Sequence, residues 1–298
     1  MKTITLLGGS MLVIAAFSST IFASDYADLN FIGFSLDGKY MAFEQYGKRD
    51  ENDLDSDENY AETFFIEVAK DSYALPPSAY ACDLGEVTQA ACRQRLARYN
   101  AKTAAALKKL GIIRRNTGRQ VVAHLLNDWS FVTPAQVKGS VTDANNKSVD
   151  RIVTDYMAGI LPHGAGAETV VFNPDFFPPH YDATMFYELT LTSKQIPEAR
   201  CFEGYRFDLT LSDKSHHKDL PDQILHKDND NIPASRFCPK GYRIEQVYFY
   251  KNRVAVFINM FQQGFGIEMR YLSVTGKLNI DSVGPHALNA NTSYEPIK

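Results

Sequence analysis

Two short segments contain residue types that match catalytic serine motifs, but their spacing departs from those motifs. Residues 33–38 (GFSLDG) approximate the serine nucleophile elbow G-x-S-x-G, with the second glycine one residue late. Asp37 and Gly38 also predict a turn between two strands, whereas the elbow requires a turn from strand to helix. Residues 215–218 (SHHK) have the S-x-x-K spacing of a serine–lysine site, without the S-D-N and K-T-G partners. The sequence therefore predicts no catalytic residue.

Two other segments contain side chains that bind metals. Asp53, Asp55 and Asp57 have the alternate spacing of a calcium loop, but Glu58 and Phe64 stand where an EF-hand needs glycine and glutamate. A second, polar segment offers imidazole and carboxylate ligands without the spacing of a known zinc or iron motif; its members are His216, His217, Asp219, Asp222, His226, Asp228 and Asp230. We expect solvated loops at both places, with no metal and no cofactor.

The chain has four cysteines, and their even number predicts disulfide bonds in an exported protein. Three pairings are possible. Proximity in the sequence favours Cys82 with Cys92 and Cys201 with Cys238. The first bond would tie a loop to the start of a helix, and the second would close the polar segment of histidines and aspartates. No C-x-x-C pair is present, which argues against zinc.

The first residues have the pattern of an export signal. Lys2 supplies a positive start, residues 6–22 are uncharged, and Ala23 is a small residue suited to signal peptidase. We expect residues 1–23 to be removed as a signal peptide; a retained membrane anchor is the alternative. Residues 24–298 are then expected to form one domain that does not span a membrane. A net charge of −4 argues against a nucleic-acid partner.

Alternation of apolar and polar residues predicts a chain composed mainly of β-strands, with one helical insertion. Aromatic residues, which suit pleated sheets, make up 12% of the chain. The helix is expected at about 87–111, with Thr88 as its N-cap and Gly111 as its end. Strands are expected at 31–34, 40–46, 63–68, 120–125, 148–154, 169–172, 185–192, 205–211, 244–250, 253–260 and 269–274.

Two segments near the ends of the mature chain are similar to each other. Residues 245–264 and residues 31–47 each comprise an aromatic strand, a polar turn and an apolar strand ending in aromatic residues and glycine. A third strand follows in both segments. The pattern predicts antiparallel β-meanders, arranged either as propeller-like blades or as a β-sandwich, and the two arrangements remain open.

Several of these segments resemble a bacterial family of predicted secreted proteins, catalogued as a domain of unknown function. They are FIGFSLDGKYMAFEQYG, FFIEV, ACDLGEVTQAAC, GYRFDLTL and RVAVFINMFQQGF…RYLSVTGKL. The motif FSxDGKYxAF also resembles blades of the TolB and WD40 kind. The resemblance implies export from a Gram-negative cell, to the periplasm or beyond, and it implies no activity.

The predicted helix is basic, and the next residues are basic too: Arg93, Arg95, Arg98, Lys102, Lys108, Lys109, Arg114 and Arg115. Such a face can dock on an anionic partner, or it can simply be solvated. We expect a non-catalytic module that binds an envelope macromolecule or protein whose identity the sequence does not give. A hydrolase of an envelope polymer, with an unrecognised active site, is the alternative.

Overall fold

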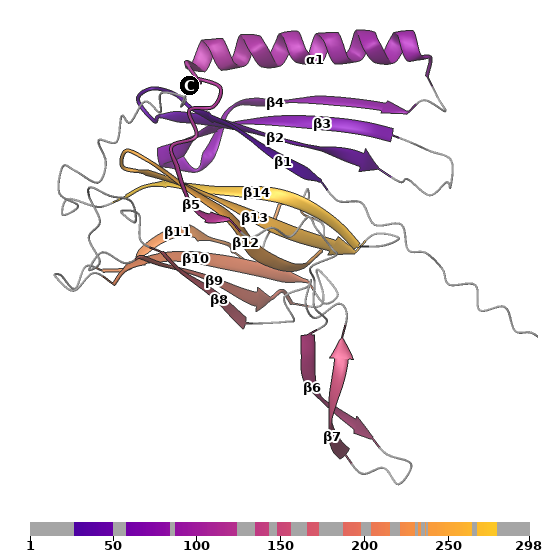
Figure 1. Cartoon of the computed structure of the whole chain (residues 1–298), viewed down its shortest axis with the longest axis vertical. Coiled ribbons are helices and arrows are strands. Elements are labelled where there is room, and N and C mark those ends of the chain that lie inside the picture. Colours follow the sequence, from indigo (N-terminus) through magenta and orange to yellow (C-terminus); the bar gives the residue numbers. More distant parts are fainter. Residues whose placement is uncertain are drawn as a thin grey trace, which may run out of the picture.

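Three four-stranded antiparallel sheets lie on top of one another, and one long helix covers the outer face of the first sheet (Figure 1). This computed structural model describes residues 27–49, 58–83, 87–123, 135–142, 148–155, 166–172, 187–197, 204–214, 221–229, 232–233, 236, 238–263 and 267–278. Because every neighbouring pair of strands is antiparallel, each sheet is a meander or is extended from one. The expected mainly-β fold of antiparallel meanders is therefore confirmed.

The first sheet has the order β1-β2-β3-β4, with β1 (Asp28–Phe34), β2 (Tyr40–Arg49), β3 (Glu58–Glu67) and β4 (Ser72–Asp83). The central sheet has the order β14-β13-β12-β5, with β14 (Ile267–Lys277), β13 (Arg253–Gln263), β12 (Pro239–Tyr250) and β5 (Arg119–Ala123). The third sheet has the order β11-β10-β9-β8, with β11 (Gln223–Lys227), β10 (Tyr205–Asp213), β9 (Tyr187–Gln195) and β8 (Gly166–Phe172). A separate hairpin pairs β6 (Ala135–Thr142) with β7 (Ser148–Asp155).

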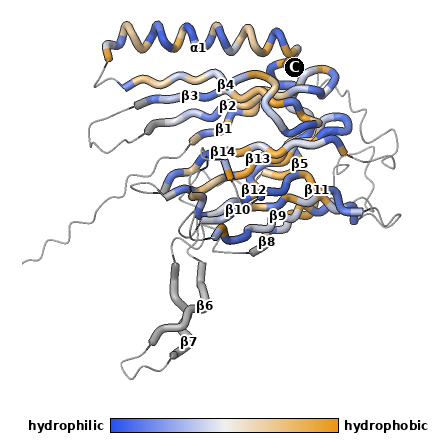
Figure 2. The backbone as a smooth tube through the Cα atoms, turned by 180° about the vertical axis from the view of Figure 1, so that it is seen from behind, coloured by the Kyte–Doolittle hydropathy of each residue, from blue (hydrophilic) through white to orange (hydrophobic). Residues whose placement is uncertain are grey.

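The central sheet is buried on both faces, and β13 shows this most clearly. Val254, Val256 and Ile258 belong to the core shared with the third sheet, whereas Ala255 and Phe257 belong to the core shared with the first sheet. All five side chains are 0% exposed. A strand that is covered on both faces needs apolar residues at consecutive positions, which explains the unbroken apolar run in its sequence. Figure 2 shows the contrast with α1, where hydrophobic and hydrophilic residues alternate along the tube.

Aromatic rings fill the core between the first and central sheets. Phe257 of β13 lies 5.1 Å from Phe31 and 5.3 Å from Phe43, measured between ring centroids. Phe34 stacks on Tyr250 at 5.2 Å. The two similar segments of the sequence therefore form neighbouring meanders packed face to face, so the beginning and the end of the described chain share one core (Figure 1).

The helix α1 (Gln89–Leu110) confirms the expected helical insertion. The Thr88 side chain accepts a hydrogen bond from the Ala91 amide at 3.3 Å, and Gly111 ends the helix with a left-handed φ of 63°. A narrow stripe of the helix is buried, formed by Cys92, Tyr99, Thr103 and Leu107. Leu107 packs against Ala42 and Phe65 of the first sheet.

The structure contains three strands that the sequence did not predict, β4, β6 and β11, and most of the predicted strands are longer than expected. Pro76 and Pro77 lie inside β4, which is tolerated because β4 is an edge strand with a bulge opposite Phe64. The sequence predicts that one strand ends at residue 46 and the next begins at residue 63, but β2 extends to Arg49 and β3 begins at Glu58. The cross-strand register pairs Gly47 with Tyr60, which continues the ladder beyond the predicted strand ends.

Residues 1–23, including the predicted cleavage site Ala23, lie outside the described residues, so the signal peptide stays a prediction. No helix among the described residues is long and apolar enough to cross a lipid bilayer. Figure 1 shows the described sheets stacked as layers. The described sheets are not arranged as a propeller ring.

We predict that Gly33→Ala destabilises the protein strongly. Gly33 has a φ of 139°, and an added Cβ would lie 2.4 Å from the carbonyl oxygen of Ile113. The free energy of unfolding should fall by about 2–4 kcal/mol, because the variant combines backbone strain with a clash against backbone.

Gly111→Ala is the matched control, because Gly111 also has a positive φ but an added Cβ would meet nothing within 4 Å. It should cost only about 1 kcal/mol. Urea unfolding measures both changes, and equal losses for the two variants would contradict the close approach at Gly33.

Candidate functional site

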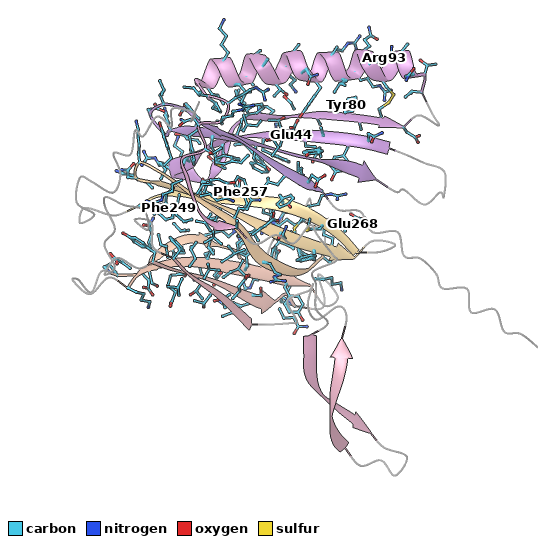
Figure 3. All side chains as sticks on the ribbon, viewed as in Figure 1. Glu44, Tyr80, Arg93, Phe249, Phe257 and Glu268 are labelled. Carbon is cyan, nitrogen blue, oxygen red and sulfur yellow. A yellow bond between two sulfur atoms is a disulfide. The ribbon has the colours of Figure 1, made fainter. Side chains whose placement is uncertain are left out.

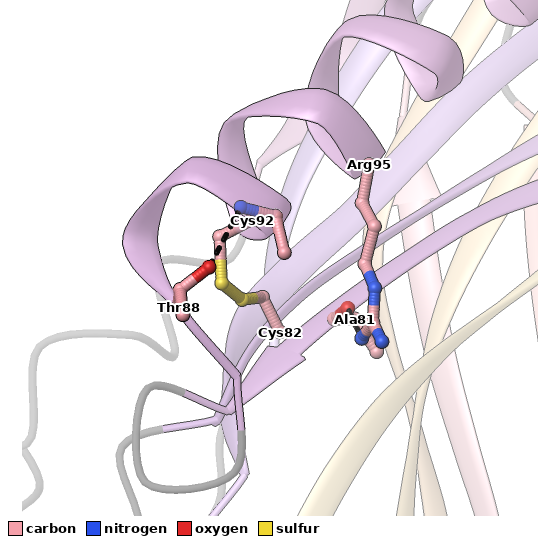
Figure 4. Close-up of a disulfide and its surroundings, with 6 residues drawn as sticks. Ala81, Cys82, Thr88, Cys92 and Arg95 are labelled. Carbon is pink, nitrogen blue, oxygen red and sulfur yellow. Dashed lines mark hydrogen bonds between the residues drawn. A yellow bond between two sulfur atoms is a disulfide. The ribbon is translucent and has the colours of Figure 1, made fainter.

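A disulfide bond holds the start of α1 against the end of β4. Cys82 and Cys92 are joined, with their Cα atoms 5.7 Å apart (Figure 4). In the same region, the Arg95 guanidinium donates a hydrogen bond to the carbonyl oxygen of Ala81 at 3.4 Å. Cys238 is also disulfide-bonded, whereas Cys201, the partner that the sequence predicts for it, lies outside the described residues. The first bond fixes the position of the helix over the first sheet.

Tyr99 fastens the middle of α1 to the outer face of the first sheet. Its hydroxyl lies 2.6 Å from the Thr63 hydroxyl and donates a hydrogen bond to Glu44 Oε1 at 2.6 Å. Burial, followed by the hydrogen bond to Glu44, raises the pKa of Tyr99 well above its ordinary value, so the phenol stays protonated. The other carboxylate oxygen of Glu44 accepts a hydrogen bond from the Asn30 side chain at 3.0 Å. Glu44 is therefore held by donors from both β1 and α1.

Next to this contact, an open cleft of about 420 Å³ lies between α1 and the first sheet. Figure 3 shows Glu44 and Tyr80, which come from β2 and β4 beneath the helix. The cleft is lined by Asn30, Glu44, Tyr46, Gly47, Asn59, Tyr60, Ala61, Tyr80, Leu96, Tyr99 and Asn100. The site is a shallow hollow that is open to solvent, not an enclosed cavity. Four strands and the helix each contribute to it, so it depends on the position of α1.

The cleft combines ring faces with hydrogen-bonding groups. The Tyr46 side chain is 42% exposed and Leu96 is 40% exposed, so apolar surface is open to a ligand. The rings of Tyr80 and Tyr99, which both line the cleft, lie 6.2 Å apart. The exposed side-chain amide of Asn100 offers both donors and an acceptor. This arrangement suits a neutral ligand that has apolar patches and many hydroxyl or amide groups.

A second polar cluster joins all three sheets. His226 on β11 lies between two carboxylates, with Nε2 2.9 Å from Asp228 and Nδ1 3.4 Å from Asp71. Asp71 follows the short helix η1 (Val68–Lys70) in the turn before β4, and it accepts a hydrogen bond from the Thr275 amide of β14 at 2.8 Å. Asp228 accepts two hydrogen bonds from Arg236, at 2.8 and 2.9 Å. The cluster is thus a clasp between the first, central and third sheets.

The hydrogen bonds of this clasp set the charge of the histidine. Burial alone would lower the pKa of His226, but the hydrogen bonds to Asp228 and Asp71 outweigh it and raise the pKa to about 9. Burial likewise opposes the ionised form of Asp228, and the contacts with His226 and Arg236 lower its pKa nonetheless. Phe207 supports the site, because its ring stacks on the imidazole at 4.7 Å and its amide donates to Asp228 at 3.0 Å.

The structure locates some of the candidates from the sequence and leaves others outside the described residues. Ser35 is 3% exposed and donates a hydrogen bond to Asp37 at 2.6 Å, so it shapes the turn between β1 and β2. Of the polar histidine and aspartate segment, His226 and Asp228 meet in the clasp, and Asp222 is exposed. The described residues contain no group of three or more His, Cys, Asp or Glu side chains that could hold a metal ion. The remaining candidates lie outside the described part of the chain: Asp53, Asp55, Asp57, Ser215, His216, His217, Lys218, Asp219 and Asp230.

The cleft was not predicted, although the sequence contained a partial signal for it. Glu44 and Tyr46 alternate with buried residues on a predicted strand, which places them together on one face. Tyr99 is an aromatic residue in a helix otherwise rich in alanine, lysine and arginine. The sequence does not indicate that the face of α1 with Tyr99 packs against the face of β2 with Glu44 and Tyr46.

A family model described as "Predicted secreted protein (DUF2259)" matches residues 42–277. The chain belongs to this family. The matched region extends from β2 to the end of β14 and includes α1, both cysteines of the bond at its start, and most of the cleft. Searches of curated proteins and of solved structures found no match. Membership of this secreted family agrees with the export signal that the sequence predicts, and it assigns no activity.

We predict that the double variant Cys82→Ser/Cys92→Ser loosens the start of α1. The bond closes a loop with a sequence separation of 10. Its loss should lower the free energy of unfolding by about 3 kcal/mol on the chain-entropy estimate. Hydrogen exchange should accelerate in the first turns of α1 and much less in β13; unchanged exchange in α1 would show that the bond does not hold the helix.

Stability should also fall at alkaline pH because of His226. Its pKa is raised from 6.5 to about 9, so the stabilisation is complete below pH 6.5 and is lost as the pH rises towards 9. Urea unfolding between these pH values should show this loss in the native protein, and His226→Gln should reduce it. If the variant kept the full pH dependence, another group would have to be responsible.

Proposed function

We propose that the protein is an exported, non-catalytic binding module of the bacterial envelope and that it holds a glycan segment in the cleft beneath α1. The observation that carries this proposal is the open cleft, which combines exposed ring surface with side-chain amides. In this proposal, residues 1–23 are removed at Ala23 and residues 24–298 work as one domain in the periplasm of a Gram-negative cell. The blade-like meanders, similar to TolB and WD40 repeats, serve to present this surface.

The chemistry of a pyranose ring fits the lining of the cleft. One face of a sugar presents C–H groups, which gain dispersion energy against the face of an aromatic ring such as Tyr46. The rim presents hydroxyl and acetamido groups, which match the amide of Asn100 and the carboxylate of Glu44. Because the cleft is open to solvent, a polymer can lie across it without having an end inserted.

The arrangement of carboxylates favours binding over hydrolysis. Most glycosidases use two carboxyl groups that flank the scissile bond, roughly 5–9.5 Å apart. Among the described residues that line the cleft, Glu44 is the single carboxylate, and both of its oxygens already accept hydrogen bonds, from Tyr99 and Asn30. A carboxylate held in this way is placed to accept hydrogen bonds from a ligand at its remaining lone pairs.

We predict that soluble envelope glycans bind at this cleft, with chitotriose as the first probe in isothermal titration calorimetry. Tyr46→Ala should weaken binding by about tenfold, since one ring contact of this kind contributes roughly 1–1.5 kcal/mol. Tyr73→Ala is the matched control, because Tyr73 is 63% exposed on the same sheet but outside the cleft. Equal weakening by both variants would contradict the site, and release of new reducing ends would favour the hydrolase alternative.

A further inference from the structure

Positive charge is concentrated on one outer element of a chain that is negative overall. The net charge is −4, yet the described residues 87–123 contain no aspartate or glutamate. They contain Arg93, Arg95, Arg98, Lys102, Lys108, Lys109, Arg114, Arg115 and Arg119. Figure 1 shows α1, which carries six of these, as the outermost layer of the stack, and Figure 3 places Arg93 at its N-terminal end.

Among the described residues, two of the six cations on α1 bind the rest of the fold. Arg95 and Lys102 donate hydrogen bonds, each 3.4 Å long, to the carbonyl oxygens of Ala81 and Pro77 on the edge strand β4. These contacts cover an exposed strand edge. Within the described part of the chain, Arg98, Lys108 and Lys109 are exposed and form no ion pair with a carboxylate.

Helix stability does not account for this concentration of charge. The positive end of the helix dipole favours acidic residues in the first turn, and α1 has none there. Alternating acidic and basic residues would add favourable pairs between neighbouring turns, whereas like charges at this spacing repel. A helix selected for stability alone would carry both signs, so the charge indicates a partner outside the fold.

Four of the cations form a row along one side of the helix. Arg95, Arg98, Lys102 and Lys109 are separated by three, four and seven residues, which places them on one flank of α1. A helix of 22 residues is about 33 Å long. Alanines occupy much of the surface between the cations, so the row projects above its surroundings. Leu96 and Asn100, which line the cleft, are on the other flank and stay clear of it.

From this arrangement we propose that α1 docks the protein on an anionic phospholipid surface. The lipid phosphates accept hydrogen bonds from Arg98, Lys109 and their neighbours, and contact is by charge without insertion of the helix. A protein partner would call for an apolar centre in the interface, and this flank offers alanines and charges instead. A continuous layer of phosphates matches a row of separate cations better than a single acidic site does. The cleft remains accessible beside the bilayer.

Sedimentation of the exported protein with lipid vesicles tests this proposal. The protein should bind vesicles that mix phosphatidylglycerol with phosphatidylcholine, fail to bind vesicles of phosphatidylcholine alone, and dissociate in concentrated salt. Because its net charge is negative, such binding has to come from a localised positive face. Binding to both kinds of vesicle alike, or to neither, would overturn the proposal.

Variants then locate the surface. Arg98→Gln/Lys108→Gln/Lys109→Gln removes three charges while keeping good helix formers, and it leaves Arg95 and Lys102 bound to β4. Each basic residue near an anionic surface strengthens binding roughly fivefold, so partitioning should fall by about 100-fold. Lys39→Gln/Lys227→Gln/Lys277→Gln is the control, since it removes the same charge from exposed positions outside α1. A similar loss in both triple variants would overturn the assignment to α1.

Discussion

The architecture depends on a central sheet that has no solvent-facing side. Every apolar side chain of β13 between Val254 and Phe261 is buried, and burying one such side chain contributes roughly 1.5–3 kcal/mol. Loss of either outer sheet would expose one apolar face of β13 to solvent. The His226 clasp adds an electrostatic link across the same stack, because one imidazole contacts the turn before β4 through Asp71 and the third sheet through Asp228.

The candidate site depends on a few specific contacts of α1, whereas the stacked sheets depend on a large apolar core. The helix α1 buries only a narrow stripe, so its position depends on particular contacts rather than on a large apolar face. The bond between Cys82 and Cys92 fixes one end, and the Tyr99–Glu44 hydrogen bond fixes the middle. The stacked sheets supply rigidity, while the helix and its attachments shape the cleft on one flank and the cationic row on the other.

Local sequence signals predicted the elements well and the site poorly. The turn at Asp37-Gly38, the cap at Thr88 and the end at Gly111 are set by neighbouring residues, and the structure contains all three. Strand β4 was missed because Pro76 and Pro77 normally interrupt strands, and only its edge position makes them acceptable. The cleft was missed because Glu44, Tyr80 and Tyr99 come from three elements whose packing no local pattern encodes.

The face-to-face packing of the first and last meanders has a consequence for biosynthesis. Phe31 and Phe43 are synthesised long before their partner Phe257, because β3, β4, α1 and the whole third sheet lie between them in the sequence. The inner face of the first sheet therefore lacks its covering layer until β13 has been synthesised, and the core shared by the two sheets forms only after that. For an exported chain, this separation in the sequence delays the packing of the first sheet against β13 until both segments are available.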